Sequence, residues 1–242
     1  MSGLTIGESQ FRDDDGSAPP QAAAALAAFA AGQGSENAAV QALSSARLLV
    51  PVLAAAGQDR DSEMSVPNLV GADGRAAIPA FTSVAAMARW RPRARPVPAA
   101  TAQVCQAAVA GQCAVVVDIA GPVPLAIDGA RLAALAQGRP VPPPHQDPDV
   151  LAAVQAAAAG LSEIAGIWLA APDTAAGREP GGGGNRDGDR DPGTDLVVGL
   201  RLAPGLSQAQ ARQAAGTLAE RVMARLGGRL RRGITIAVEA GG

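Results

Sequence analysis

Residues 73–92, DGRAAIPAFTSVAAMARWRP, contain the signals that decide the fold. The Asp-Gly pair at its start separates two apolar segments, which favours the tight turn of a β-hairpin. The next strand contains Pro79, which has no amide hydrogen to donate, so we expect this strand near a sheet edge. Thr82 and Ser83 then precede the apolar stretch VAAMARW, where a hydroxyl side chain caps a helix. A hairpin followed directly by a helix predicts mixed secondary structure.

The flanking segments supply the rest of a first domain. The alanine-rich stretch 21–31 predicts a helix, Ser35 can cap a second helix, and the apolar run LLVPVLAA at 48–55 predicts a strand. Downstream, the pattern predicts a helix, two strands and a closing helix, in the order 101–111, 113–121, 124–128 and 129–138. We therefore expect an α+β domain over residues 21–137, preceded by a disordered acidic tail over 1–20.

A second domain follows a proline-rich segment. Residues 138–149 hold five prolines and predict a semi-rigid linker. Residues 150–242 predict another domain with a disordered Gly/Asp/Arg loop at 175–194; its helices are expected at 150–160 and 207–227, and its strands at 166–172, 195–204 and 233–240. The predicted fold class is α+β: two small domains, each a short mixed sheet with helices packed on it.

The composition excludes several classes of enzyme. All 20 basic residues are arginine, so no lysine is present for a Schiff base, a Ser–Lys dyad or a phosphate-binding loop. A histidine-based nucleophile would have to use His145, which lies in the proline-rich segment. We expect no catalytic residues and no cofactor.

Cysteine content and charge placement predict the cellular context. Cys105 and Cys113 allow at most one disulfide, which favours a reducing compartment. The uncharged run from residue 16 to 35 follows three aspartates, where a signal peptide needs positive charge. We expect a cytoplasmic protein with no membrane partner.

Two groups of acidic residues raise the question of a metal. Asp187, Asp189 and Asp191 alternate as in a calcium loop, but proline and valine replace the required glycine and glutamate, and a solvated insertion is the alternative. His145, Asp147 and Asp149 offer only one imidazole on a linker. We therefore expect no metal site.

The C-terminal segment offers two further hypotheses. Ser207 follows a strand and begins a helix, as an exposed serine nucleophile does, but with Gln210 it also forms a capping box, which we favour. An excess of arginine in this segment suggests nucleic-acid binding. Against this, Arg221 and Arg225 fall on the solvent side of a helix whose apolar face is Ala211, Ala215, Leu218, Val222 and Leu226.

The stretch RWRPRARP at 89–96 concentrates four arginines around Trp90. Guanidinium groups beside an indole can bind a carboxylate or a phosphate. The alternative is a solvated arginine run with Trp90 packed in the core.

The order of three segments resembles the SseB family, named for enhanced serine sensitivity. These segments are LLVPVLAA, then DGRAAIPAFTSVAAMARWRP, then QAAVAGQCAVVVDIAGPVPLAID. The resemblance spans residues 36–137, and a weaker one continues over 149–239 to the family's C-terminal region. It implies an α+β fold in the cytosol, and it carries over no catalytic residues.

We expect a non-enzymatic interaction or regulatory protein. The alternatives are a small-molecule-binding enzyme that uses carboxylates and arginine, and nucleic-acid binding through the basic C-terminal helix. The expected partner is a protein that presents an acidic or strand-like segment, because a sheet edge and a cationic loop would meet it. The candidate binding residues are Phe81, Thr82, Ser83, Trp90, Arg91, Arg93 and Arg95.

Overall fold

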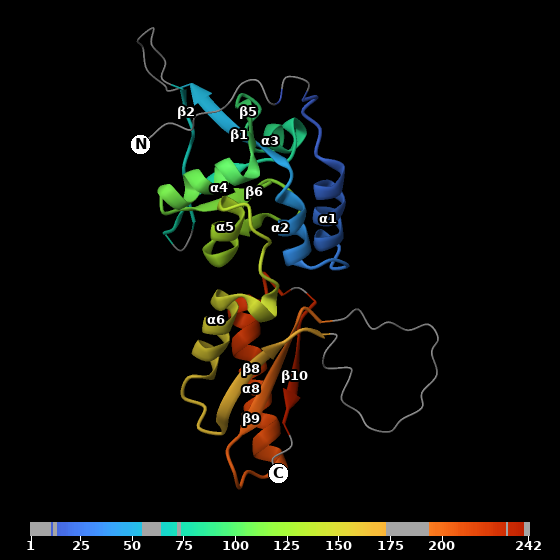
Figure 1. Ribbon diagram of the computed structural model, residues 1–242, viewed down its shortest axis with the longest axis vertical. Coiled ribbons are helices and arrows are strands. Elements are labelled where there is room, and N and C mark those ends of the chain that lie inside the picture. Colours follow the sequence, from blue (N-terminus) through green and yellow to red (C-terminus); the bar gives the residue numbers. More distant parts are fainter. Residues whose placement is uncertain are drawn as a thin grey trace, which may run out of the picture. The chain divides into compact units, whose positions relative to one another are not determined.

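The computed structural model describes residues 11, 14–54, 64–71, 74–172, 194–230 and 232–239. The chain divides into two compact units, Met1–Val141 and Pro142–Gly242 (Figure 1). Both units combine helices with a small sheet, so the predicted α+β class is confirmed. No helix in the described part of the chain is both long and apolar enough to cross a bilayer.

The first unit places five helices and seven strands in its described residues. The helices are α1 (Pro20–Ala30), α2 (Glu36–Leu43), α3 (Val84–Trp90), α4 (Thr101–Ala110) and α5 (Gly129–Ala136). The strands are β1 (Arg47–Ala54), β2 (Met64–Ser65), β3 (Leu69–Val70), β4 (Ala76–Ala80), β5 (Arg95–Ala100), β6 (Ala114–Val117) and β7 (Leu125–Ile127). Ser35 begins α2 as predicted, because its side chain accepts a hydrogen bond from the Ala38 amide at 3.1 Å.

Two short sheets are joined at one backbone pair. Their strand orders are β2-β1-β5, which is antiparallel, and β3-β4-β6-β7, in which β4 and β6 run parallel. Leu49 and Phe81 exchange two backbone hydrogen bonds, with N–O distances of 2.8 and 2.9 Å. This bridge connects β1 to the end of β4, so the chain segment Phe81–Ser83 lies where the two sheets meet.

Strand β1 contributes side chains to two separate cores. Leu48 and Val50 belong to the larger core, which the helices α1, α2, α4 and α5 cover (Figure 1). Leu49 points to the opposite face and joins Phe81 and Met87 in a smaller cluster under α3. The alternation follows from the period of two along a strand, and it makes β1 the central element of the unit.

The structure corrects two expectations about proline. Strand β4, which contains Pro79, is not an edge strand, because it lies between β3 and β6. Strand β3 pairs only with Ala76 and Ala77, so no residue of β3 lies opposite Pro79. The missing amide of Pro79 therefore removes no hydrogen bond on that side of β4. Conversely, the arginine-rich loop expected after Trp90 ends at Arg95, where β5 begins; this strand contains Pro96 and Pro98, yet it pairs with β1 along six residues.

Residues 138–149, predicted as a linker, carry local structure. Val141 is buried with the larger core of the first unit, and its amide donates to the side chain of Gln41 at 2.8 Å. A 3-10 helix occupies Pro144–Gln146, and α6 already begins at Pro148. Prolines at these positions suit the extended and first-turn conformations that precede a helix.

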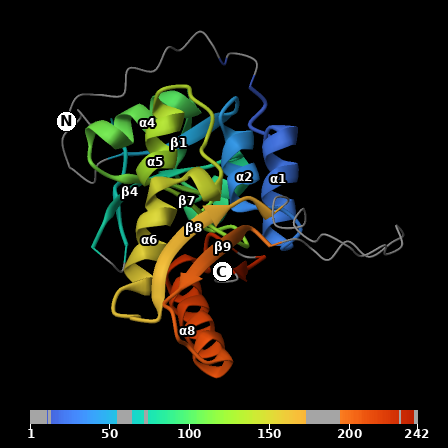
Figure 2. The same ribbon diagram turned by 60° about the horizontal axis from the view of Figure 1, so that its bottom comes forward.

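The second unit is a three-stranded mixed sheet with two helices on one face (Figure 2). Its elements are α6 (Pro148–Ala158), β8 (Ile164–Ala170), β9 (Leu196–Leu202), α8 (Gln208–Leu226) and β10 (Ile234–Val238), with sheet order β10-β9-β8. Val154, Val198 and Leu218 share one core, which shows that α6 and α8 cover the same face. Ser207 is the N-cap of α8 and forms the predicted capping box with Gln210.

The other face of this sheet carries Trp168 directly over a glycine. Trp168 on β8 pairs with Gly199 on β9, and a Cβ atom built on Gly199 would lie 2.0 Å from the indole ring. Only a residue without a side chain leaves room for the ring here.

Replacing Gly199 with alanine is therefore expected to displace Trp168 and to lower the free energy of unfolding by about 1–3 kcal/mol, because overpacking forces a strained rearrangement. Chemical denaturation followed by far-ultraviolet circular dichroism measures this in every variant, because without Trp168 the fluorescence would come from Trp90 in the first unit alone. The double variant Gly199→Ala/Trp168→Ala serves as the control. Gly199→Ala should lower the free energy of unfolding less in a Trp168→Ala background than in the parent. An equal effect in both backgrounds would show that the indole ring does not impose the requirement for glycine.

Candidate functional site

The segment Phe81–Ser83 forms a buried corner where the two sheets of the first unit meet. Phe81 is fully buried by its bridge to Leu49, and Thr82 is 4 % exposed. Thr82 donates twice to the carboxylate of Asp118, from its amide at 2.9 Å and from its hydroxyl at 2.6 Å. Ser83 caps α3 as predicted, since its hydroxyl accepts from the Ala86 amide at 3.1 Å. All three predicted residues therefore hold the corner together.

Asp118 was not predicted, and its backbone explains why it can reach Thr82. It follows β6 directly and adopts a left-handed φ of 50°, a conformation that aspartate tolerates better than most residues. Its amide donates to the Ala80 carbonyl at 2.9 Å, and its own carbonyl accepts from Gly121 at 2.7 Å. Two backbone bonds thus fix the turn and aim the carboxylate at the corner. A single acidic residue directly after the apolar run AVVV was the available signal.

Arg47 is a buried cation at the start of β1, with 8 % of its side chain exposed. It holds the corner from the other side, because its Nη1 donates to the Thr82 carbonyl at 2.5 Å. Its Nε and Nη2 bind the carboxylate of Asp14 as a fork, with 2.9 Å for the Nη2 bond, and Nη2 also donates to the Ser17 carbonyl at 2.5 Å. A buried guanidinium requires such a partner, because an uncompensated charge in the interior is costly.

Residues 14–17, predicted as part of a disordered tail, are thus held against the domain. We call them the N-terminal strap. Besides the bonds to Arg47, the Gly16 carbonyl accepts the Val84 amide at 2.9 Å. Gly16 has a φ of +76°, and a Cβ atom there would lie 2.6 Å from Cγ2 of Val84. The strap therefore contacts Val84, the first residue of α3. The sequence did not predict this contact, because the acidic, turn-rich residues were interpreted from composition alone.

Trp90 and the arginines around it lie at the opposite end of α3. The Trp90 ring packs on Phe81 with a centroid distance of 5.4 Å, and the guanidinium carbon of Arg91 lies 4.9 Å above the indole. Arg89, Arg93 and Arg95 are exposed. We call Arg89, Arg91, Arg93 and Arg95 the arginine rim. Arg95 begins β5 and pairs with Val52, so it stands on a strand and not on a mobile loop.

The predicted residues accordingly fall into two neighbouring groups. Phe81, Thr82 and Ser83 form the corner, and Trp90 with the arginine rim forms the surface at the end of α3. Phe81 is common to both, because it is bridged to Leu49 and also contacts Trp90. Arg47, Asp118 and Asp14 complete the corner without having been predicted.

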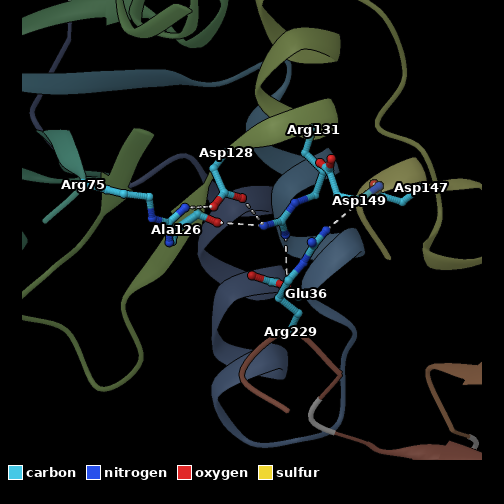
Figure 3. Close-up of polar contacts among 8 residues, drawn as sticks. All are labelled: Glu36, Arg75, Ala126, Asp128, Arg131, Asp147, Asp149 and Arg229. Atoms are coloured by element: carbon cyan, nitrogen blue, oxygen red, sulfur yellow. Dashed lines mark hydrogen bonds and ion pairs between the residues drawn. The ribbon is translucent and has the colours of Figure 1, made fainter. Parts of the chain in front are cut away.

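A separate ion network holds α2 to α5 within the first unit (Figure 3). Arg131 is 2 % exposed, and its Nη1 lies 3.0 Å from the Glu36 carboxylate. Its Nη2 donates to the Ala126 carbonyl at 3.1 Å and to Asp128 at 3.3 Å, and Asp128 also binds Arg75 at 2.8 Å. Positive and negative groups balance here, so the arrangement cross-links the elements.

The remaining candidates have local structural roles or lie outside the described residues. Asp147 caps α6 by accepting the Asp149 amide at 2.9 Å, and it binds Arg229 at 2.7 Å (Figure 3). Within the described ranges, no group of three or more His, Cys, Asp or Glu side chains is placed to hold a metal ion. The aspartates 187, 189 and 191 lie outside the described residues.

Both cysteines are unpaired thiols. Cys105 is fully buried in the larger core, and burial raises the pKa of its thiol to about 12. Burial also raises the pKa of Cys113, which packs against the same core. Thiolates are the reactive form of cysteine, so neither residue has the environment of a nucleophile.

The comparison with known families supports the resemblance stated above. Residues 23–134 match the family model described as SseB protein N-terminal domain. The match covers most of the first unit, including Arg47, Thr82, Trp90 and Asp118, and the N-terminal strap lies before it. Residues 23–134 are therefore similar to the N-terminal domain of SseB proteins. Searches of curated proteins and of solved structures gave no match.

Replacing Thr82 with valine removes the hydroxyl bond to Asp118 while keeping the side-chain shape. We expect the free energy of unfolding to fall by about 1–3 kcal/mol, as for other hydrogen bonds to a charged group. The companion variants are Asp118→Asn and the pair Thr82→Val/Asp118→Asn. Strict additivity of the two single effects in denaturant titrations would contradict a direct coupling between the side chains.

The pH dependence of stability tests the bond between Asp14 and Arg47. The hydrogen bonds from Arg47 hold the pKa of Asp14 below its ordinary value of 3.8. A lowered folded-state pKa contributes stability above the ordinary pKa, and this stability is lost as the pH falls through the folded value. We expect the free energy of unfolding to be higher for the parent than for Asp14→Asn at neutral pH, and this difference to shrink as the pH is lowered to about 3. A constant difference between the two proteins over this range would count against the bond.

Proposed function

We propose that the protein is a non-enzymatic interaction module that binds an acidic segment of a partner protein through the arginine rim. Trp90 forms the apolar floor of this surface, and the rim arginines supply the positive charge. Arginine and tryptophan are the residue types that most often dominate the energy of protein interfaces. The proposal includes a cytoplasmic location and no cofactor, and it treats the likeness of residues 149–239 to the family's C-terminal region as a prediction.

One observation carries the proposal: the arginine rim gathers four guanidinium groups that have no carboxylate partner among the described residues of the first unit. Among the described residues of this unit, Arg47, Arg75 and Arg131 bind carboxylates, and Arg139 donates to the side chain of Gln137. No described carboxylate lies within ion-pairing distance of the rim guanidinium groups. Arginines held close together without counter-ions favour a ligand that supplies several carboxylates.

The geometry of β5 favours recognition by side chains over recognition by an added strand. Leu49 uses its backbone groups to bridge Phe81, so the neighbouring residues of β1, Leu48 and Val50, are the ones that bond β5. In this register Pro96 and Pro98 face outward, and the Ala100 amide donates to Gln103 at 3.3 Å. The outer edge of β5 thus lacks the amide donors that a strand-like partner would need.

Two alternatives receive less support. An enzyme that used carboxylate and arginine would need Asp118 and Arg47, but Thr82 already donates twice to the first and Asp14 neutralises the second. Nucleic-acid binding through the second unit would need free arginines there. Within its described residues, Arg201, Arg229 and Arg232 bind carboxylates, and Arg221 donates to the carbonyls of Ala157 and Ala159. Arg212 and Arg225 on α8 bind no described carboxylate, so the helix offers fewer such arginines than the rim.

The test compares two charge-matched triple variants of the full chain. Arg91→Gln/Arg93→Gln/Arg95→Gln removes three of the four rim charges, while Arg139→Gln/Arg212→Gln/Arg225→Gln removes the same charge from positions that bind no described carboxylate. Arg229 is avoided in the control, because its loss would leave the buried Asp147 uncompensated. Glutamine keeps much of the side-chain stem that packs on the surface.

We expect both variants to fold like the parent, as judged by circular dichroism and melting temperature. Proteins recovered from native lysate by the parent and identified by mass spectrometry should be lost from the rim variant and retained by the control. Their capture should also weaken as salt is raised, because exposed charges are screened. Partners that persist on the rim variant but disappear from the control would place the interaction elsewhere.

A further inference from the structure

We infer that Arg47, which the Thr82 carbonyl holds in position, forms with the Val84 amide a second recognition site, specific for a carboxylate on an acidic peptide segment of a partner, and that the N-terminal strap occupies this site as an internal ligand. The site lies at the start of α3, and it is independent of the arginine rim at the other end of that helix.

The first argument is the distribution of bonds around Arg47. Its guanidinium makes one bond to the corner, at the Thr82 carbonyl. Its other bonds go to the strap: two to the Asp14 carboxylate and one to the Ser17 carbonyl. The domain therefore positions this cation but leaves its neutralisation to the strap.

The second argument is the absence of another counter-ion in the described residues. Asp118 is the acidic side chain at the same corner, and both its carboxylate oxygens accept from Thr82. With the strap in place only 8 % of the Arg47 side chain is exposed, so Asp14, and not water, compensates its charge. A guanidinium fork that is fixed in place and lacks a carboxylate of its own domain is suited to bidentate recognition of an external one.

The third argument is how the strap is attached. Its contacts are the Asp14 carboxylate, two backbone carbonyls and the turn at Gly16, whose amide bonds Asp14 at 2.7 Å. These are the groups that any short acidic turn of a partner would offer. The strap contributes none of the apolar side chains of the two cores in this unit, so its exchange for a partner segment would leave both cores intact.

The site also recognises backbone groups of the bound segment. The Val84 amide donates to the Gly16 carbonyl, and the Arg47 Nη2 donates to the Ser17 carbonyl, so backbone groups two and three residues after the aspartate are recognised. A carbon atom at the position of the Gly16 Cβ would collide with Val84. The site therefore favours a segment with aspartate followed two residues later by glycine.

The test opens the site in the full chain and supplies the ligand separately. The variant Asp14→Ala/Gly16→Ala removes the carboxylate and disfavours the strap turn, because alanine meets Val84 and tolerates a positive φ poorly. The probe is a synthetic peptide of residues 11–20, FRDDDGSAPP. Two control peptides carry alanine in place of the aspartate at position 14 or at position 15. Asp15 suits the comparison, since the hydrogen bonds of its carboxylate go to Ser17 within the strap and not to Arg47.

We expect the peptide to bind the variant at least about tenfold more tightly than the parent in calorimetric titrations, and to raise the melting temperature of the variant. Alanine at position 14 should abolish this binding, and alanine at position 15 should preserve it. Equal binding to parent and variant, no binding to either, or indifference to position 14 would overturn the inference and leave Asp14 and Arg47 as a purely structural pair.

If the double variant does not fold, Asp14→Asn provides the second measurement. Hydrogen exchange at the Val84 amide reports whether the Gly16 carbonyl is in place. We expect this amide to exchange at least about tenfold faster in Asp14→Asn than in the parent, and to regain protection when the peptide is added, whereas Asp15→Asn should behave like the parent. Unchanged exchange in Asp14→Asn, or no recovery with peptide, would contradict an exchangeable internal ligand.

Discussion

The backbone pair between Leu49 and Phe81 is the constraint on which the first unit depends. It ties the antiparallel sheet built on β1 to the mixed sheet that contains β4 and β6. By using the backbone groups of Leu49, it determines that Leu48 and Val50 bond β5, and hence that the prolines of β5 face outward. It also places Thr82 directly after the junction, where Asp118 and Arg47 reach it from opposite sides. The corner and the two surfaces at the ends of α3 all follow from this one connection.

Alanine supplies six of the 20 buried residues of the larger core beside this junction. The larger core includes Ala22, Ala39, Ala80 and Ala108, all fully buried. Alanine contributes little apolar area, so stability must come from close approach of the elements and from polar cross-links. The ion pairs of Arg47 and Arg131 are such cross-links, and each joins segments far apart in the sequence. A chain with few large apolar residues thus uses buried arginine to fix the relative positions of its elements.

Local patterns predicted much of this fold, and pairing between distant segments accounts for the rest. The helix caps at Ser35, Ser83 and Ser207 were visible because capping depends on residues three apart. Strand β5 was missed because proline disfavours strands, and only the register against β1 makes Pro96 and Pro98 acceptable. The same reason explains why Pro79 was placed at an edge. For the site, the sequence singled out Phe81–Ser83, Trp90 and three of the rim arginines. Asp118 had only the weak signal of an acidic residue after an apolar run, and Arg47 becomes recognisable only when the sheets meet.

The burial of Cys105 has a consequence for following the first unit in solution. A thiol whose pKa is about 12 is almost entirely protonated near neutral pH, and it is fully enclosed by the larger core. Alkylating reagents react with the thiolate, so Cys105 becomes available to them only in molecules whose core has opened. Cys113, which is only partly buried, lies within reach more often. The alkylation rate of Cys113 therefore reports local fluctuations near the surface, and the alkylation rate of Cys105 reports the opening of the core.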